Sequence, residues 1–130
     1  MTNERAAPAR TPAQRAAYAR GVAAEGRAAR LMEAHGFAIL DRRARTKAGE
    51  IDLIARRDDL LVFCEVKQRA SLEAAAESLL ARQQRRIAAA AEAWLAGHPE
   101  LSGLNMRFDA ILIAGTAVEH LPGAFEAELG

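Results

Sequence analysis

The chain has 130 residues, of which 51% are hydrophobic and 27% are charged, a mixture typical of one soluble globular domain. Cys64 is the single cysteine, which excludes an intramolecular disulfide and a cysteine-rich zinc site, and no apolar run is long enough to cross a membrane. The net charge of +1 does not by itself indicate a nucleic-acid partner, and the basic N-terminus lacks the apolar core of a secretory signal, so we expect a cytoplasmic protein.

The N-terminal part of the sequence predicts an arm followed by a helix. Residues 1–13 are rich in Ala, Pro and Arg without periodicity, which indicates a disordered basic arm. We expect a single domain over residues 14–130. Its first element is a helix over residues 14–35, because this stretch is rich in the helix formers Ala, Arg and Glu and is followed by Gly36, a typical helix end.

Strands dominate the rest of the chain. Four stretches with β-branched or large apolar residues predict strands: 37–42, 50–56, 60–67 and 106–114. Asp58 and Asp59 form the turn between the second and third strands, and a second long helix is expected over 72–96. The tail 116–130 either adds a short strand or stays irregular. This order predicts an α/β fold in which a mixed sheet is flanked by helices.

Acidic residues on two of these strands are predicted to meet. Side chains alternate along GEIDLIA, residues 49–55, so that Asp52 points to one face and Ile51, with Leu53, to the other. If the turn between the two strands is symmetric, Asp52 lies opposite Glu65, with Cβ atoms about 5 Å apart. Lys67 follows Glu65 by two residues and therefore shares its face.

A carboxylate pair of this kind needs a compensating charge. Two carboxylates repel each other by roughly 4 kcal/mol at 4 Å in a dielectric of about 20, and a proton, a lysine or a divalent cation would offset that repulsion. Oxygen ligands without His or Cys favour Mg²⁺ or Mn²⁺ over zinc. Such an ion would activate water for phosphodiester hydrolysis, with Lys67 orienting that water. The spacing equally allows a surface ladder of ion pairs with no ligand.

Glu25 on the first helix is a further candidate ligand. One apolar stripe contains residues at spacings of four and three: Tyr18, Val22, Glu25, Ala29 and Met32. A carboxylate within this stripe needs a partner and would reach toward the metal site. An alternative buried face consists of Ala24, Ala28 and Leu31. In that case Glu25 lies at the edge of the buried face.

Three other residues are expected to have structural roles. Cys64 lies on the strand face opposite the acids, which predicts a buried thiol rather than a nucleophile. Trp94 lies at helical spacing from Ile87 and Ala91 and is expected in the core. Asp109 is expected to pair with Arg107 or another basic group.

Four segments of the sequence resemble the YraN-type family of small bacterial proteins: GVAAE, GEIDLIA, LVFCEVKQR and RFDAILI. That family in turn resembles archaeal Holliday junction resolvases and the restriction-endonuclease-like, PD-(D/E)XK nuclease superfamily. The resemblance extends over residues 19–114. It implies a restriction-endonuclease-like three-layer fold, with a central mixed β-sheet flanked by helices.

The resemblance also implies roles for individual residues. The family's metal-site acids correspond to Asp52 and Glu65, its active-site lysine to Lys67, and the helix glutamate that completes the site in resolvases to Glu25. Glu25, Asp52 and Glu65 would then hold Mg²⁺ or Mn²⁺, and all four residues would be catalytic. Arg69 matches a motif position and is a candidate phosphate contact.

Basic residues near these motifs are the candidate nucleic-acid contacts: Arg42, Arg43, Arg45, Arg69, Arg82, Arg85 and Arg86. The charge pattern alone also allows the cluster in residues 42–47 to be an ordinary solvated loop. Two positions depart from the family pattern. Arg43 replaces a frequent Asn, and Gln83 replaces a frequent Lys.

We expect a Mg²⁺-dependent nuclease that cuts DNA, including branched or junction DNA. A homodimer is expected because a junction has two symmetric strands to cut. The main alternative is a nucleic-acid-binding module on a nuclease fold that does not cut, which the low net charge and the two departures favour. A structural domain with an ion-pair ladder is the third possibility. Presence of Asp52, Glu65 and Lys67 together favours the nuclease.

Overall fold

The computed structural model describes residues 9–127. Its elements follow in chain order: α1 (Pro12–Ala34), β1 (Ala38–Thr46), β2 (Gly49–Arg57), β3 (Leu60–Gln68), α2 (Leu72–Glu77), α3 (Ala81–Ala96), the short 3₁₀ helix η1 (Pro99–Leu101), β4 (Asn105–Ala114) and β5 (Ala117–Phe125). The tail, for which the sequence left two possibilities, forms the long strand β5. A turn containing Gly115, whose φ is +58°, connects it to β4.

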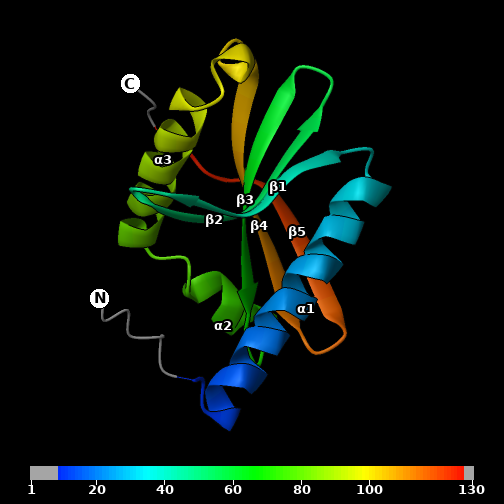
Figure 1. Cartoon of the computed structure of the whole chain (residues 1–130). Coiled ribbons are helices and arrows are strands. Elements are labelled where there is room, and N and C mark those ends of the chain that lie inside the picture. Colours follow the sequence, from blue (N-terminus) through cyan, green and yellow to red (C-terminus); the bar gives the residue numbers. More distant parts are fainter. Residues whose placement is uncertain (1–8, 128–130) are drawn as a thin grey trace, which may run out of the picture.

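All five strands belong to one sheet in the order β1-β2-β3-β4-β5. Neighbouring strands are antiparallel except β3 and β4, which are parallel. Figure 1 shows α1 on one side of the sheet and α3 on the other. The predicted α/β class, with a mixed sheet between helices, is therefore confirmed.

A hydrophobic core lies on each face of the sheet. The core under α1 is built mainly of Ala28, Ala29, Met32, Leu53, Val62, Cys64 and Ile111. The core under α3 is built mainly of Ile51, Ile54, Phe63, Ile87, Ala91, Trp94 and Phe108. The sequence correctly predicted that Cys64 and Trp94 are buried. Burial raises the pKa of the Cys64 thiol far above its ordinary value, which agrees with a structural thiol.

Helix α1 begins at Pro12, two residues inside the predicted arm. Thr11 caps it, because its Oγ1 accepts a hydrogen bond from the Gln14 N–H at 3.1 Å while the Gln14 side chain accepts one from the Thr11 N–H. The first eight residues of the predicted arm lie outside the described residues. Within residues 9–127, no helix combines the length and the apolar character needed to cross a membrane.

The buried face of α1 differs from the stripe that contains Tyr18 and Val22. Both of these side chains are 45% exposed, whereas Ala24 and Ala28 are buried. The buried face combines parts of both predicted faces: Ala24 and Ala28 come from the alternative face, Ala29 and Met32 come from the stripe, and Leu31 is only partly buried. Glu25 lies at the edge of this face. Small alanine side chains let α1 approach the sheet closely, which explains why Met32 is the only large apolar side chain of α1 that is fully buried within residues 9–127.

The predicted second long helix is two helices. Ser78 ends α2, with its Oγ donating to the Ala75 carbonyl at 2.6 Å, and Leu80 begins α3 in an extended conformation. Between them, Leu79 packs against both the core under α3 and the small core formed with α2. The prediction of one continuous helix was wrong because this tertiary packing outweighs local helix propensity.

Candidate metal and nucleic-acid site

The predicted β2–β3 register is confirmed, but only as far as Leu53. Leu53 pairs with Cys64, as a symmetric turn requires, and no strand pairing with β3 is observed beyond it toward Asp52. The Asp52 carboxylate accepts a hydrogen bond from the Val66 N–H at 2.8 Å. If the pairing of β2 with β3 continued, a carbonyl oxygen of β2 would accept the hydrogen bond of the Val66 N–H. The Asp52 carboxylate accepts it instead, which allows β2 to leave β3 at this point.

The departure of β2 also changes which way its side chains face. Ile51 packs in the core under α3 with Ile54, whereas Leu53 packs under α1. The prediction that Ile51 and Leu53 share a face was therefore wrong, because strict alternation ends where β2 bends away from β3. The opening that results lies next to Asp52.

A cavity of about 450 Å³ occupies this opening, between α1, β2 and the end of β3. Its charged lining residues come from all three elements: Arg20, Glu25, Asp52, Glu65, Lys67 and Arg69. All four predicted catalytic residues therefore line one cavity. An ion-pair ladder on an open sheet face would not be enclosed by a helix in this way.

Glu65 and Lys67 form a buried ion pair within the cavity. The Lys67 Nζ lies 3.1 Å from the Glu65 Oε1, and the two residues are 8% and 7% exposed, respectively. Both project from the same face of β3, as their spacing predicted. Burying a lysine and a carboxylate costs desolvation free energy that their mutual attraction need not recover. This ion pair is therefore weak evidence for a purely stabilising role.

Asp52 belongs to the same electrostatic cluster. Burial, the negative charge of Glu65 and a hydrogen bond with Glu65 together raise the pKa of Asp52 from 3.8 to about 7. The Val66 N–H and the charge of Lys67 oppose this rise. Near neutral pH, Asp52 therefore takes up a proton, unless a divalent cation supplies the compensating positive charge.

Glu25 faces the cavity but is held by Arg43. The Arg43 Nε lies 2.7 Å from the Glu25 Oε2, and the Arg43 guanidinium also lies over the Tyr18 ring at 4.8 Å. Burial raises the pKa of Glu25, while the hydrogen bond from Arg43 and its positive charge lower it. The expected partner of this carboxylate is thus an arginine.

The Asp52–Glu65 pair has the donor chemistry that divalent metal ions prefer. The two carboxylates offer hard oxygen donors, and a cation would relieve the repulsion that raises the pKa of Asp52. Glu25 does not complete the predicted set of three metal ligands in this structure, because its carboxylate is bonded to Arg43. Within residues 9–127, no three Asp, Glu, His or Cys groups are close enough together to hold a metal ion.

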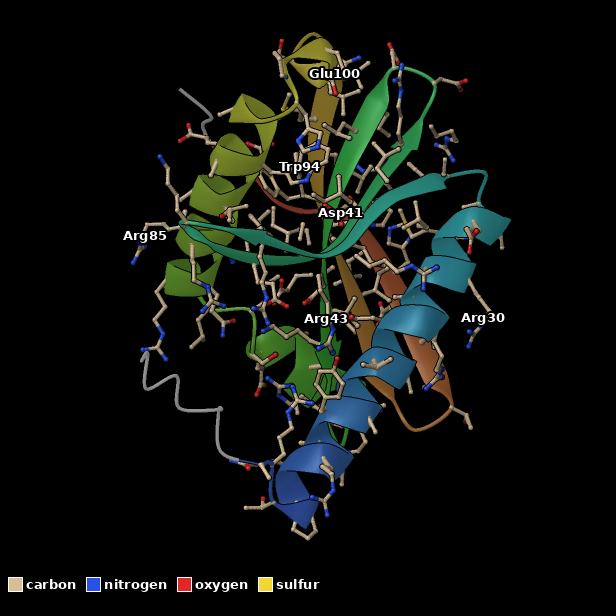
Figure 2. All side chains as sticks on the ribbon, viewed as in Figure 1. Arg30, Asp41, Arg43, Arg85, Trp94 and Glu100 are labelled. Atoms are coloured by element: carbon tan, nitrogen blue, oxygen red, sulfur yellow. The ribbon has the colours of Figure 1, made fainter. Side chains whose placement is uncertain are left out.

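The predicted nucleic-acid contacts fall into separate groups. Arg69 lines the cavity, and Arg43 reaches its Glu25 side. Arg42 and Arg45 are exposed on β1, where Arg45 lies 3.8 Å from Glu50. The remaining three residues lie on α3, outside the cavity lining: Arg82, Arg85 and Arg86. Figure 2 shows Arg85 on the outer side of α3, across the molecule from Arg43 and α1.

Sequence reasoning missed Arg20 at the cavity. Arg20 lies on the face of α1 that also carries Ala17, Ala24 and Glu25 toward the cavity. Arg20 follows Ala17 by three residues and precedes Ala24 by four, so helical spacing places it on this face. The apolar stripe through Tyr18 and Val22, on which the prediction for Glu25 was based, does not include Arg20.

Asp109 lies outside this site. It is fully buried in β4, receives two hydrogen bonds from Arg107 at 2.8 and 2.9 Å, and contacts the His120 Nε2 at 2.7 Å. The Gly123 N–H donates a further hydrogen bond to it at 2.9 Å. The predicted pairing with Arg107 is confirmed, and His120 is a partner that the sequence did not reveal.

The model of the family described as "Uncharacterised protein family UPF0102" matches residues 24–113, most of the chain. The chain belongs to this family. The YraN-type resemblance of its motifs is therefore confirmed. The matched region contains all four predicted catalytic residues, whereas Arg20 and strand β5 lie outside it.

Several UPF0102 proteins are similar over nearly their full length. A UPF0102 protein of Azorhizobium caulinodans is 66% identical over 125 residues, which cover 93% of this chain and 95% of the relative. One from Rhodopseudomonas palustris strain CGA009 is 55% identical and covers 86% of this chain and 87% of the relative. A Bradyrhizobium protein, from strain ORS 278, is 52% identical, with 92% and 87% covered. Their names give the family and no activity.

Proposed function

We propose that this UPF0102 protein is a Mg²⁺-dependent nuclease that hydrolyses phosphodiester bonds in DNA, including branched or junction DNA. The observation that carries the proposal is the Asp52–Glu65 carboxylate pair, with Lys67 beside it in a cavity at the end of β3. We further propose that its mixed sheet between helices is a variant of the restriction-endonuclease-like fold. The sheet order, with one parallel pair at its centre, supports that assignment.

Asp52 and Glu65 would hold the Mg²⁺, and Glu25 would add a ligand if released from Arg43. When bound, the ion would polarise a phosphoryl oxygen and lower the pKa of a coordinated water. Lys67 would donate a hydrogen bond to the attacking water or to a phosphate oxygen. The buried position of its ammonium makes that interaction stronger than it would be in open solvent.

Arg20 and Arg69 would hold the phosphates that flank the scissile bond. Both line the cavity and both are exposed, so a strand can reach them from solvent. Guanidinium groups bind phosphate in a two-pronged geometry, which positions a strand without reading its sequence. This arrangement predicts a nuclease with little base preference.

The test is cleavage of linear, flapped and four-way DNA, and of RNA of the same sequence, with Mg²⁺ or Mn²⁺. We expect metal-dependent cutting by the wild type and a loss of more than about 100-fold in Asp52→Asn and in Lys67→Met. Asp58→Asn, in the exposed β2–β3 turn, is the matched control and is expected to keep wild-type activity.

Two results would contradict this proposal. The first is absence of cutting of every substrate by a folded wild-type protein with either metal. The second is cutting that survives both substitutions, which would identify a contaminating nuclease. Light scattering with and without four-way DNA tests the homodimer that we propose for a junction substrate.

A second candidate function is nucleic-acid binding without cutting. The specific observation in its favour is that Arg43 holds Glu25, leaving only two carboxylates together. In that case the wild type binds DNA with a strong salt dependence, Asp52→Asn binds equally well, and no metal supports cleavage. Fluorescence anisotropy and the cleavage assay together separate this candidate from the nuclease.

A further inference from the structure

Arg43 occupies a place in the fold that several contacts fix at once. Its Nε bonds the Glu25 carboxylate at 2.7 Å, and its guanidinium lies over the Tyr18 ring. The same guanidinium fits against Gly21, where a Cβ would lie 3.0 Å from its terminal nitrogen. Glycine at this position of α1 therefore leaves the room that the Arg43 side chain uses.

The backbone of Arg43 is in a conformation that arginine rarely adopts. Its φ is +48°, in the left-handed region, which costs a non-glycine residue of order 1 kcal/mol. Arg43 lies between the β1–β2 pairs Arg42–Leu53 and Ala44–Ile51, and so stands opposite Asp52. The strained backbone thus holds a cation next to two of the carboxylates of the candidate site.

We propose that Arg43 is an internal cation that competes with the divalent metal for Glu25, and so limits the resting site to the Asp52–Glu65 pair. This inference rests on the proposed function, because it concerns the same metal site. Arg43 acts through Glu25 and is therefore a positioning residue. It contributes a positive charge without taking part in coordination.

The competition follows from the charges around Glu25. A carboxylate that already accepts a charge-assisted hydrogen bond must lose it before it binds a metal ion, so the metal has to displace Arg43. The Glu25 side chain is only 13% exposed, and little solvent is available to stabilise it during the exchange. Removing the guanidinium leaves Glu25 as an unpaired acid beside Asp52, where a divalent ion would be bound more tightly.

The test is Mn²⁺ binding by the full-length protein, measured by titration calorimetry without nucleic acid. Arg43→Asn removes the guanidinium, and asparagine tolerates the left-handed backbone better than most residues. We expect it to bind Mn²⁺ roughly tenfold more tightly than the wild type, a difference of about 1.4 kcal/mol. Arg43→Lys keeps the positive charge, so we expect its Mn²⁺ affinity to stay close to that of the wild type.

A double-mutant cycle assigns the gain to Glu25. Glu25→Gln alone should change Mn²⁺ affinity by less than about twofold, because Arg43 already occupies this carboxylate. In the Arg43→Asn background, the same Glu25→Gln change should remove the tenfold gain. Arg30→Gln removes one positive charge from the exposed side of α1 and is the control for net charge, with no change in affinity expected (Figure 2).

Three outcomes overturn this inference in different ways. If Mn²⁺ binds in an Asp52-dependent way but equally to wild type and Arg43→Asn, the inference is wrong while the proposed metal site stands. A gain in Arg43→Asn that persists after Glu25→Gln overturns it equally, because the competition must run through Glu25. If neither protein binds Mn²⁺, the inference and the proposed metal site both fail.

Discussion

Asp52 makes the protein sensitive to pH near neutrality. Its pKa is about 7 in the folded protein, because of burial and Glu65, against an ordinary value of 3.8. Between about pH 4 and pH 7 the folded state therefore holds a proton that the unfolded state has lost. Stability must fall as the pH rises through this range, since folding then requires proton uptake.

Asp52→Asn should remove this dependence. The amide is neutral at every pH and can still accept the Val66 N–H. We expect the free energy of unfolding at pH 8 to rise by roughly 2–4 kcal/mol, with little change near pH 4. Urea denaturation between pH 4 and 8, with a chelator present, measures the free energy of unfolding of both proteins. Asp58→Asn is the control and should show the pH dependence of the wild type. If Asp52→Asn also loses stability with rising pH as the wild type does, the prediction is contradicted.

Asp109 should show the opposite behaviour. Burial alone would raise its pKa, but hydrogen bonds from Arg107, Gly123 and His120 outweigh burial, so the pKa is lowered. Its stabilising effect is therefore present above the ordinary pKa and is lost as the pH falls through the lowered value. The ionised carboxylate is thus the form that the fold requires.

Asp109→Asn should destabilise the protein by about 3 kcal/mol at pH 7, because it leaves the partly buried Arg107 without its counter-charge. Denaturation by urea at pH 7 measures this loss. Mn²⁺ affinity serves as the internal control and should be unchanged in the folded variant, because Asp109 does not line the cavity. A loss below about 1 kcal/mol would show that Arg107 does not need the charge of Asp109.

At the level of elements, the turn between β1 and β2 depends on Gly49. Its φ is +142°, which side chains rarely allow, and a Cβ there would lie 3.3 Å from the Arg86 Cγ on α3. This contact joins the β1–β2 turn to α3, on the side of the sheet away from α1.

Gly49→Ala should therefore lower the free energy of unfolding by about 1–3 kcal/mol, through backbone strain and the displaced Arg86. Gly103→Ala is a matched control, because a Cβ at Gly103 meets nothing within 4 Å and its φ is not in the left-handed range. Thermal denaturation of the two variants side by side measures the difference. Equal melting temperatures would exclude a special role for the Gly49 conformation.

The elements themselves could be predicted well where the pattern is local. Alternation placed Glu65 and Lys67 on one face of β3, and the symmetric turn predicted the β2–β3 register as far as Leu53. The break in pairing at Asp52, whose carboxylate accepts the Val66 N–H, could not be predicted from this pattern. The break at Leu79 could not be predicted, since it depends on two cores that form only in the folded chain. The role of Arg43 was likewise hidden, because it depends on where α1 crosses the sheet and on an unusual backbone angle.

For the whole molecule, the distribution of charge matters more than its sum. The net charge is +1, yet Arg20, Lys67 and Arg69 surround one cavity. The acids in the same cavity reduce the attraction for a polyanion until a divalent cation offsets them. DNA binding at this site should therefore be stronger with Ca²⁺ or Mg²⁺ than with a chelator.

Arg20→Gln and Arg69→Gln should each weaken DNA binding and reduce the slope of log affinity against log salt by about 0.9, the value for one phosphate contact on duplex DNA. Fluorescence anisotropy in Ca²⁺, at several salt concentrations, measures both quantities. Arg30→Gln has the same charge change and should leave the slope unaltered. If Arg85→Gln weakens DNA binding more than Arg69→Gln does, the DNA contact surface lies on α3 and not at the cavity.

The parallel pairing of β3 with β4 has a consequence for how the protein folds. Glu25, Asp52, Glu65 and Lys67 all lie in the first 67 residues, but β3 is completed as a central strand only when β4, which starts at Asn105, pairs with it. Parallel pairs joined by a long crossover close late, since the loop entropy is lost before contacts form. On the ribosome, the acids are thus synthesised early and become an ordered site only after nearly the entire chain has emerged.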